Sequence, residues 1–132
     1  MARTLGFLER QAVKTLIFQA DTGERVLVML GGDQSAVSGN LKKAIGSRNI
    51  RMADPQAVLD TTGYVIGSIP PFSWQPQGFR SFLEKSLLSE PLLGVGAGQW
   101  GNEIMITPGE LVRASRAIVV NLTQAGAPVT DT

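Results

Sequence analysis

The chain has 132 residues, which fits one domain, because a domain of about 130 to 150 residues buries roughly two-thirds of its unfolded surface. Its 43% hydrophobic and 17% charged residues are typical of a globular protein and exclude a disordered chain. A net charge of +1 gives no strong global attraction to nucleic acid or membrane.

The sequence contains neither cysteine nor histidine. Without cysteine, disulfides and thiolate metal sites are excluded, and a reducing compartment is expected. Without histidine, the chain cannot form serine–histidine or cysteine–histidine nucleophiles or histidine-ligated metal sites. We therefore expect any hydrolysis to rely on a positioned water and polarising groups, with no cofactor and no metal.

The apolar runs are short, as in VLVML at 26–30, and cannot cross a bilayer. The first residues, MARTLGFLER, lack the hydrophobic core of a signal peptide. These features predict a cytoplasmic protein without a membrane partner.

The first part of the chain predicts a helix end followed by a β-hairpin. Residues 2–10 resemble the last turns of a helix that begins without a cap, so an upstream segment is expected to be missing. The runs at 12–20 and 25–30 are rich in strand-forming residues and flank a turn that contains Gly23. They predict two antiparallel strands.

Two short helices with a brief strand between them are expected next. The first covers residues 39–47, where apolar residues share one helical face before a glycine. After a strand at 49–53, Asp54 and Pro55 provide an N-cap and a first helical residue. This second helix is predicted to end at Gly63.

The second half predicts further strands and a third helix. The expected elements are a strand at 79–84, a hairpin of 91–98 and 102–106, a helix from Thr107 to about Arg113–Arg116, and a strand at 117–123. Residues 1–123 are expected to form a single domain and residues 124–132 a flexible tail. This order predicts an α/β fold with a mixed, mostly antiparallel sheet and short flanking helices.

The segment TGYVIGSIPPF at 62–72 is unlike a strand, because its glycines cost chain entropy and its proline pair removes ladder donors. Gly67 would let the backbone approach a ligand closely. The amides of Gly67, Ser68 and Ile69 could then donate to one developing oxyanion. The alternative is a rigid turn between two strands.

Strand alternation places Lys14 on the same face as Leu16 and Phe18. The lysine is either a fixed cation at the rim of a pocket, able to hold a carbonyl or phosphate oxygen, or a strand-end residue whose ammonium reaches water. The glycine-rich run 94–98 could bring backbone against a substrate or make a tight strand end. It lacks the following helix that a phosphate-binding loop requires.

Three further groups are weaker candidates. Glu84 is a strand-end carboxylate that could face the same cavity. Trp74 and Trp100 lie in predicted loops, where they could form a lid, stack on a base or cover the core edge. A basic cluster near the first helix could contact phosphates or form a solvated helix face; it consists of Lys42, Lys43, Arg48 and Arg51.

Four segments, in their order and spacing, resemble the YbaK/ProX family: VKTLIF, RMADPQAV, TTGYVIGSIPPF and VGAGQWG. The resemblance covers about residues 3–123. Members are free-standing or synthetase-associated editing domains that hydrolyse misacylated tRNA. It implies a partly barrel-like α/β domain that acts in trans as an aminoacyl-tRNA deacylase, with aminoacyl-tRNA and an aminoacyl-tRNA synthetase as partners.

The resemblance also implies a site. The family lysine corresponds to Lys14, and the GxxxP loop to Gly67–Pro71, so the implied catalytic groups are Lys14, Gly67, Ser68 and Ile69. The glycine pair of the family falls on Ala97 and Gly98, and its aspartate on Glu84. The implied substrate-binding residues are Tyr64, Pro70, Pro71, Glu84, Gly96, Ala97 and Gly98.

The implied mechanism needs no side-chain nucleophile. A water attacks the ester, amides of the loop steady the oxyanion, and Lys14 positions the carbonyl or the terminal phosphate. The sequence departs from the family where Ser68 replaces a glycine and Pro70 a serine, and a strand and helix usual in the family are expected to be absent ahead of Met1. The alternatives are a catalytically weakened module that binds tRNA or a synthetase, and a small-molecule-binding protein.

Overall fold

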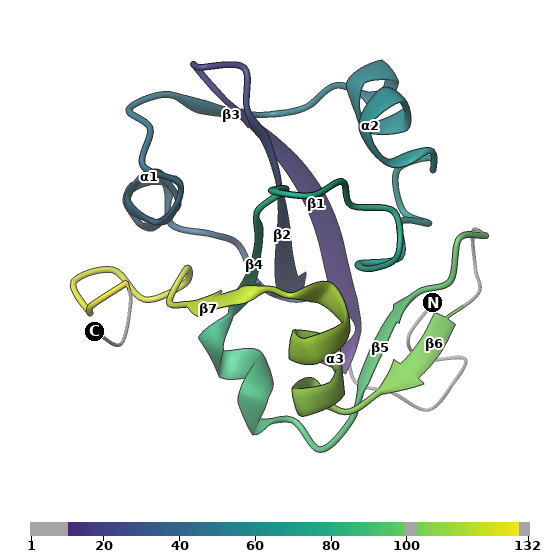
Figure 1. Cartoon of the computed structure of the whole chain (residues 1–132). Coiled ribbons are helices and arrows are strands. Elements are labelled where there is room, and N and C mark those ends of the chain that lie inside the picture. The colour runs from purple at the N-terminus through teal and green to yellow at the C-terminus, as the bar shows by residue number, and fades with distance from the viewer. Residues whose placement is uncertain (1–10, 100–102, 130–132) are drawn as a thin grey trace.

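The computed structural model of the chain describes residues 11–99 and 103–129. The helix expected at 2–10 and the side chain of Trp100 lie outside this part. Within it, a five-stranded sheet and a two-stranded sheet are packed with short helices (Figure 1). No helix in the described ranges is long and apolar enough to span a membrane.

The elements follow the expected order, with one 3-10 helix in addition. They are β1 (Val13–Ala20), β2 (Arg25–Gly31), α1 (Ser38–Ile45), β3 (Ile50–Met52), α2 (Pro55–Thr62), β4 (Ser81–Glu84), η3 (Lys85–Ser89), β5 (Leu93–Gly96), β6 (Glu103–Ile106), α3 (Pro108–Ser115) and β7 (Ile118–Val120).

The larger sheet has the strand order β3-β1-β2-β4-β7. β1 is antiparallel to β2 and to β3, and β5 is antiparallel to β6. β4 instead runs parallel to both β2 and β7, because long crossovers through helices return the chain in the same direction. The expected mixed, mostly antiparallel α/β sheet with short helices is confirmed.

Local sequence signals set the element ends. Gly23 takes a positive φ of 93° in the β1–β2 turn, a conformation that glycine adopts at low cost. The Asp54 side chain accepts a hydrogen bond of 2.8 Å from the Ala57 amide and so caps α2, which ends at Gly63 in the left-handed conformation. The Thr107 hydroxyl caps α3 in the same way.

The sheet has two buried faces, because alternate side chains of each strand point to opposite sides. One face, here called the α1 face, packs Leu30 and Phe82 against Leu41 and Ile45 of α1. The other, here called the α2 face, packs residues such as Ile17 and Leu83 against α2, α3, β5 and the segment after α2. Figure 1 shows α1 on one side of the sheet and α2 and α3 on the other.

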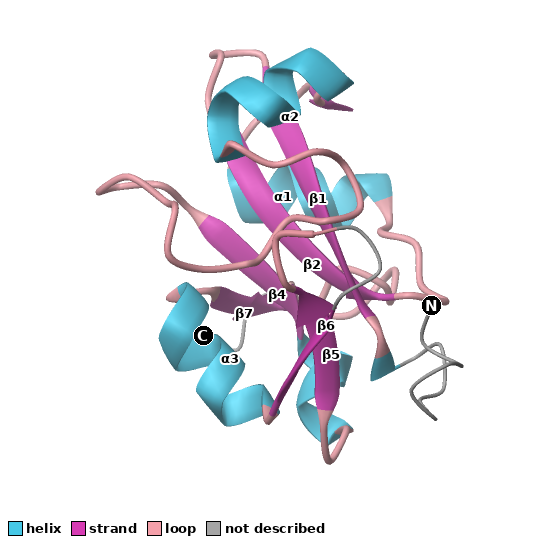
Figure 2. Ribbon diagram, turned by 90° about the vertical axis from the view of Figure 1, so that its right-hand side faces the viewer, coloured by secondary structure: helices cyan, strands magenta, loops and turns pink. Residues whose placement is uncertain are grey.

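The edge of β1 is only partly covered. β3 pairs with Phe18–Ala20, and β5 meets this edge at a single parallel bridge from Ala12 to Gly94. The Ala53 amide, directly after β3, donates to the Ile17 carbonyl at 2.9 Å, and among the described residues no strand pairs with the remaining part of that edge, 13–16. Figure 2 shows the β5–β6 hairpin set at an angle to the larger sheet near the start of β1, which gives the partly barrel-like shape.

The end of the described chain folds back onto the domain. The Asn121 amide donates to the Val129 carbonyl at 2.7 Å, and the Asn40 side chain donates to the Gln124 carbonyl at 3.1 Å. The Asn121 side chain also accepts from the amides of Thr123 and Gln124, which ends β7 earlier than the sequence predicts. Residues 124–129 of the expected flexible tail therefore carry specific contacts.

Candidate active site

The loop between α2 and the proline pair turns tightly around Gly67, whose φ is +90°. The Ser68 amide donates to the Val65 carbonyl at 3.1 Å, and the Ser68 hydroxyl donates to the same oxygen at 2.8 Å. Val65 and Ile66 are exposed at the tip of this turn, whereas Ser68 and Ile69 are buried. The segment is thus an ordered turn with an apolar tip.

The loop is seated directly on the end of β5. A Cβ atom added to Gly96 would lie 2.7 Å from the Ile69 carbonyl oxygen and 3.1 Å from the Ser68 carbonyl carbon. The Gly98 amide donates to the Ser68 carbonyl at 2.9 Å. A side chain at position 96 cannot fit against this backbone, so glycine is required there.

The residue Gly98 completes this contact. Its φ is +90°, and an added Cβ would lie 3.0 Å from Cε1 of Tyr64. The structure therefore brings together most of the substrate-binding residues that the sequence implies with the loop that carries the implied oxyanion donors. We call this group, Tyr64, Gly67–Pro71 and Gly96–Gly98, the loop cluster.

The three implied oxyanion donors differ in availability. The Ser68 amide is already bonded to Val65, so it is not free to bind a ligand in this conformation. Neither the Gly67 amide nor the Ile69 amide donates a hydrogen bond within the described ranges. Because buried or constrained amides usually find acceptors, two unpartnered amides in one rigid turn suit an external oxygen.

The exit of the loop is held by side chains from the following segment. The Trp74 indole donates to the Pro70 carbonyl at 2.6 Å, and the Gln75 amide donates to the Pro71 carbonyl at 2.7 Å. Trp74 also packs edge-on against Phe79, with ring centroids 5.0 Å apart. Of the three roles expected for Trp74, these contacts match the core-edge cover.

Lys14 lies on the α1 face and not beside the loop cluster. It lines a cavity of about 340 Å³ together with Leu16 and Phe18 of β1, Leu30 of β2 and residues of α1 and β3. No residue of the loop cluster lines this cavity. The convergence of the Lys14 ammonium and the loop amides on one small cleft, which the resemblance implies, is not seen in this arrangement.

The two regions are nevertheless neighbours along β1. Lys14 lies two residues after Ala12, which bridges to β5, and the other end of β5 carries the loop cluster. Thr15, the next residue, alternates to the α2 face, and its buried hydroxyl has no partner in the described residues. The part of the β1 edge without a paired strand, 13–16, thus lies between the two regions.

Glu84 is a buried carboxylate at the end of β4, with both oxygens occupied. Oε1 accepts from the Leu122 amide at 2.8 Å, and Oε2 accepts from the Ser86 amide at 2.9 Å. Burial raises the pKa of Glu84, but the hydrogen bonds from Ser86 and Leu122 outweigh it and hold the pKa below its ordinary value. Glu84 lines a different cavity from Lys14, next to Lys85 and Asn121.

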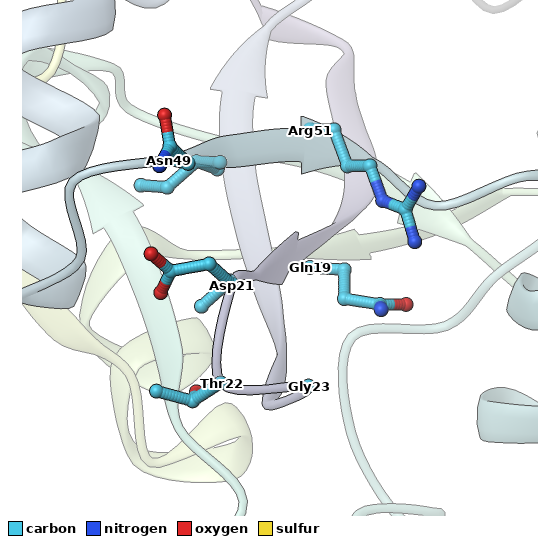
Figure 3. A pocket seen from close by; sticks show the side chains of 8 residues that line it. Gln19, Asp21, Thr22, Gly23, Asn49 and Arg51 are labelled. Carbon is cyan, nitrogen blue, oxygen red and sulfur yellow. The ribbon is translucent and has the colours of Figure 1, made fainter.

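A further cavity of about 410 Å³ lies at the far end of β1, where sequence patterns predicted only a turn. Figure 3 shows it between the β1–β2 turn and β3, with Arg51 and Gln19 on one side and Asn49 and Asp21 on the other. No group of three or more metal-ligating side chains occurs among the described residues, in this cavity or elsewhere.

Comparison with known proteins identifies the family. The profile described as "Aminoacyl-tRNA editing domain" matches residues 1–114. The chain belongs to this family. The loop cluster and Lys14 all lie within the matched range, so the resemblance seen in the four sequence segments is confirmed.

Individual relatives agree. The Escherichia coli (strain K12) protein named "Multifunctional Ser/Thr-tRNA deacylase ProXp-y" is 28% identical over 121 residues, covering 84% of this chain and 68% of the relative. A proline–tRNA ligase of Moorella thermoacetica is 26% identical over 88% of this chain, which spans only 20% of that enzyme. A crystal structure titled as a putative trans-editing enzyme for prolyl-tRNA synthetase superposes with a TM-score of 0.83 at 28% identity, over 94% of this chain and 77% of the other.

Proposed function

We propose that this protein hydrolyses the ester bond of a mischarged aminoacyl-tRNA, acting in trans. The observation that carries the proposal is the family match over residues 1–114, in which a deacylase is among the relatives. The loop cluster supports it, because it presents free backbone donors in a fixed turn. A deacylase that uses backbone donors is compatible with a chain that has no histidine and no cysteine.

In the proposed mechanism, the ester carbonyl of the substrate binds at the turn of the loop cluster. A water attacks the carbonyl carbon, and the amides of Gly67 and Ile69 stabilise the oxyanion that develops. One such donor is typically worth about 3 kcal/mol in the transition state. The amino acid then leaves as its carboxylate, and the terminal ribose hydroxyl of the tRNA is regenerated.

Lys14 is proposed to bind the terminal phosphate of the tRNA. Its ammonium lies on the α1 face, away from the loop amides, so contact with the reacting carbonyl is the less direct of its two implied roles. The substrate would pass the unpaired edge of β1 at 13–16, with its ester on the α2 face. A phosphate-binding lysine chiefly affects KM, whereas a lysine at the carbonyl chiefly affects kcat.

The tRNA and amino acid are proposed from the named relatives. Because several relatives are proline–tRNA ligases, tRNA(Pro) is the first candidate, and association with a synthetase is a further proposal. Seryl and threonyl groups are candidates from the name of the Escherichia coli relative.

The experiment is a deacylation assay with purified protein. Radiolabelled alanyl-, cysteinyl-, seryl- and threonyl-tRNA are incubated with the protein, and amino acid release is compared with the rate in buffer alone. We expect at least one of the four to be released faster. Release from none of them would overturn the proposed activity.

A second candidate function is a module that binds tRNA or a synthetase without hydrolysis. The specific observation in its favour is that the Ser68 amide and hydroxyl both bond to Val65 within the loop, so one of three implied donors is occupied. Saturable binding of tRNA with no release of amino acid would support this module over the deacylase.

A further inference from the structure

Positive charge is concentrated in one part of the chain. Residues 34–53 carry four of its twelve lysines and arginines and no carboxylate, whereas the rest of the chain has more carboxylates than cations. The nearly neutral total charge therefore conceals a separation of charge within the sequence. A local basic region of this kind attracts polyanions even when the net charge is small.

The fold places three of these four cations on one surface next to β3, the edge strand of the larger sheet. Lys42 and Lys43 lie in the last turn of α1, and together with Arg48 they line an open hollow on the surface. Arg51 comes from β3 itself, and Figure 3 shows its side chain beside Gln19 and away from Asn49, so it points to the side of the strand opposite α1. We call Lys42, Lys43 and Arg48 the basic edge.

All three side chains of the basic edge are exposed, and none forms an ion pair within residues 11–99 and 103–129. The neighbouring carboxylate, Asp21, is occupied, because it accepts a hydrogen bond of 2.7 Å from the Ser47 hydroxyl. By contrast, Arg80 is paired with Glu24, and Arg113 with Glu110. The basic edge is therefore a set of cations without internal partners.

The basic edge and the Lys14 cavity are connected by the helix α1. Leu41 and Ser38 of α1 line the Lys14 cavity, and Lys42 and Lys43 follow directly in the same helix. A chain of phosphates that runs along the basic edge would therefore reach the cavity in which Lys14 is proposed to bind the terminal phosphate.

From this placement we propose that the basic edge binds the phosphate backbone of the tRNA acceptor arm, which fixes the direction from which the aminoacyl end enters. The inference rests on the proposed function for the identity of the RNA. Exposed cations that contact phosphates act mainly by counterion release, so they contribute affinity and salt dependence and no sequence specificity.

The test measures the binding of uncharged tRNA(Pro) transcript by fluorescence anisotropy at several salt concentrations. The variant is Lys43→Gln/Arg48→Gln, and the matched control is Arg113→Gln/Arg116→Asn, which removes the same charge from α3. We expect the first variant to bind about tenfold more weakly at 50 mM salt, with the gap closing toward 200 mM. Its slope of log affinity against log salt should fall by about one for each cation removed.

The control variant should bind like the wild type, and circular dichroism should show both variants folded. An unchanged affinity and slope for Lys43→Gln/Arg48→Gln would overturn the inference. So would an equal loss in both variants, because charge alone would then explain it. If that variant instead aggregates while still binding tRNA normally, the cations protect an edge strand and the inference is also wrong.

This readout separates the inference from the proposed function, because uncharged tRNA has no ester to hydrolyse. Weakened binding in the variant together with no deacylation by the wild type would leave the basic edge supported and the enzyme refuted. Deacylation by the wild type, with an unchanged KM in the variant, would support the enzyme and refute the role of the basic edge.

Discussion

The two faces of the five-stranded sheet carry different kinds of functional group. On the α2 face, the loop cluster offers backbone: amides of a tight turn held against glycines at the end of β5. On the α1 face, Lys14 and Glu84 offer side-chain charge. Lys14 lines a cavity between β1, α1 and β3, and both carboxylate oxygens of Glu84 accept hydrogen bonds. The geometry of the loop cluster is thus fixed by glycines, which have no side chains. The chemistry of the α1 face depends instead on two charged side chains.

Because of this difference, substitutions in the two regions should have different effects. Changes in the loop cluster should impair the chemical step, since they displace the proposed oxyanion donors. Changes on the α1 face should affect substrate binding at Lys14 and stability at Glu84. Four predictions test this division, from the largest expected effect to the smallest.

The largest effect is expected for Gly96→Ala. The new Cβ would lie 2.7 Å from the Ile69 carbonyl oxygen, so the loop must shift, and a displacement of about 1 Å at a reacting group can cost 10²-fold in rate. We expect kcat for deacylation to fall by about that factor. The free energy of unfolding should fall by about 1–3 kcal/mol, measured by urea denaturation.

The matched control is Gly109→Ala in the first turn of α3. An added Cβ there meets nothing within 4 Å, and alanine is the better helix former by about 0.5–1 kcal/mol. This variant should keep full activity and be slightly more stable. Equal activities for the two variants would show that the seating of the loop is unimportant.

The second effect is expected for Lys14→Ala. A hydrogen bond to a charged group is worth about 1.5–3 kcal/mol, which corresponds to roughly 10- to 100-fold in kcat/KM. If Lys14 binds the terminal phosphate, the loss should appear mainly as a higher KM in steady-state kinetics. A loss confined to kcat would instead place the ammonium at the reacting carbonyl and bring the two faces into one site.

The third prediction concerns Glu84 and acid stability. Its pKa is lowered in the folded state, so its contribution to stability is complete above the unfolded pKa and is lost as the pH falls through the folded pKa. Glu84→Gln should lower the free energy of unfolding at pH 7 by about 1.5–3 kcal/mol, because the amide cannot accept from both Ser86 and Leu122. Urea denaturation at pH 7, 5, 4 and 3 should show a smaller pH dependence than in the wild type.

The KM of Glu84→Gln gives the complementary result. Because both carboxylate oxygens are already used, we expect the KM for aminoacyl-tRNA to stay within about twofold of the wild type. A large rise in KM without a loss of stability would support the substrate-binding role that the family resemblance implies for this residue.

The smallest effect is expected for Glu24→Gln. The hydrogen bond and charge of Arg80 lower the pKa of Glu24, but both side chains are more than one-third exposed, at 38% and 35%. Such a pair contributes about 0–1 kcal/mol after solvent screening. Thermal denaturation should therefore shift by only a few degrees, with activity unchanged. A destabilisation as large as that of Glu84→Gln would mean that an exposed carboxylate contributes as much to stability as a buried one.

Much of the fold could be predicted from local sequence. The turn at Gly23, the cap at Asp54 and the stop at Gly63 each depend on neighbouring residues, and each is found where it was expected. The parallel pairing of β4 with β2 and β7 could not be predicted in detail, because it depends on contacts between distant segments. The short helix η3, which Glu84 caps by accepting a hydrogen bond from the Ser86 amide, was not predicted.

The position of the loop in the candidate site could be predicted from the sequence, but the positions of the charged side chains relative to it could not. The glycines at 67 and 94–98 predicted close approach of the backbone to a ligand, and in the structure Gly96 and Gly98 contact the backbone of the loop that contains Gly67. Strand alternation already placed Lys14 on the opposite face of β1 from Val13 and Thr15. The face of the sheet that the loop covers could not be predicted, because it depends on how β5 crosses β1. The occupied amide of Ser68 could not be foreseen, since it depends on the conformation of the turn.

The most direct test of the proposed activity is a single-turnover deacylation assay that compares the wild type, Gly96→Ala and Gly109→Ala on one mischarged tRNA. The account predicts release by the wild type and Gly109→Ala at similar rates, and release about 10²-fold slower by Gly96→Ala. Equal release by all three, or release by none, would contradict hydrolysis at the loop cluster.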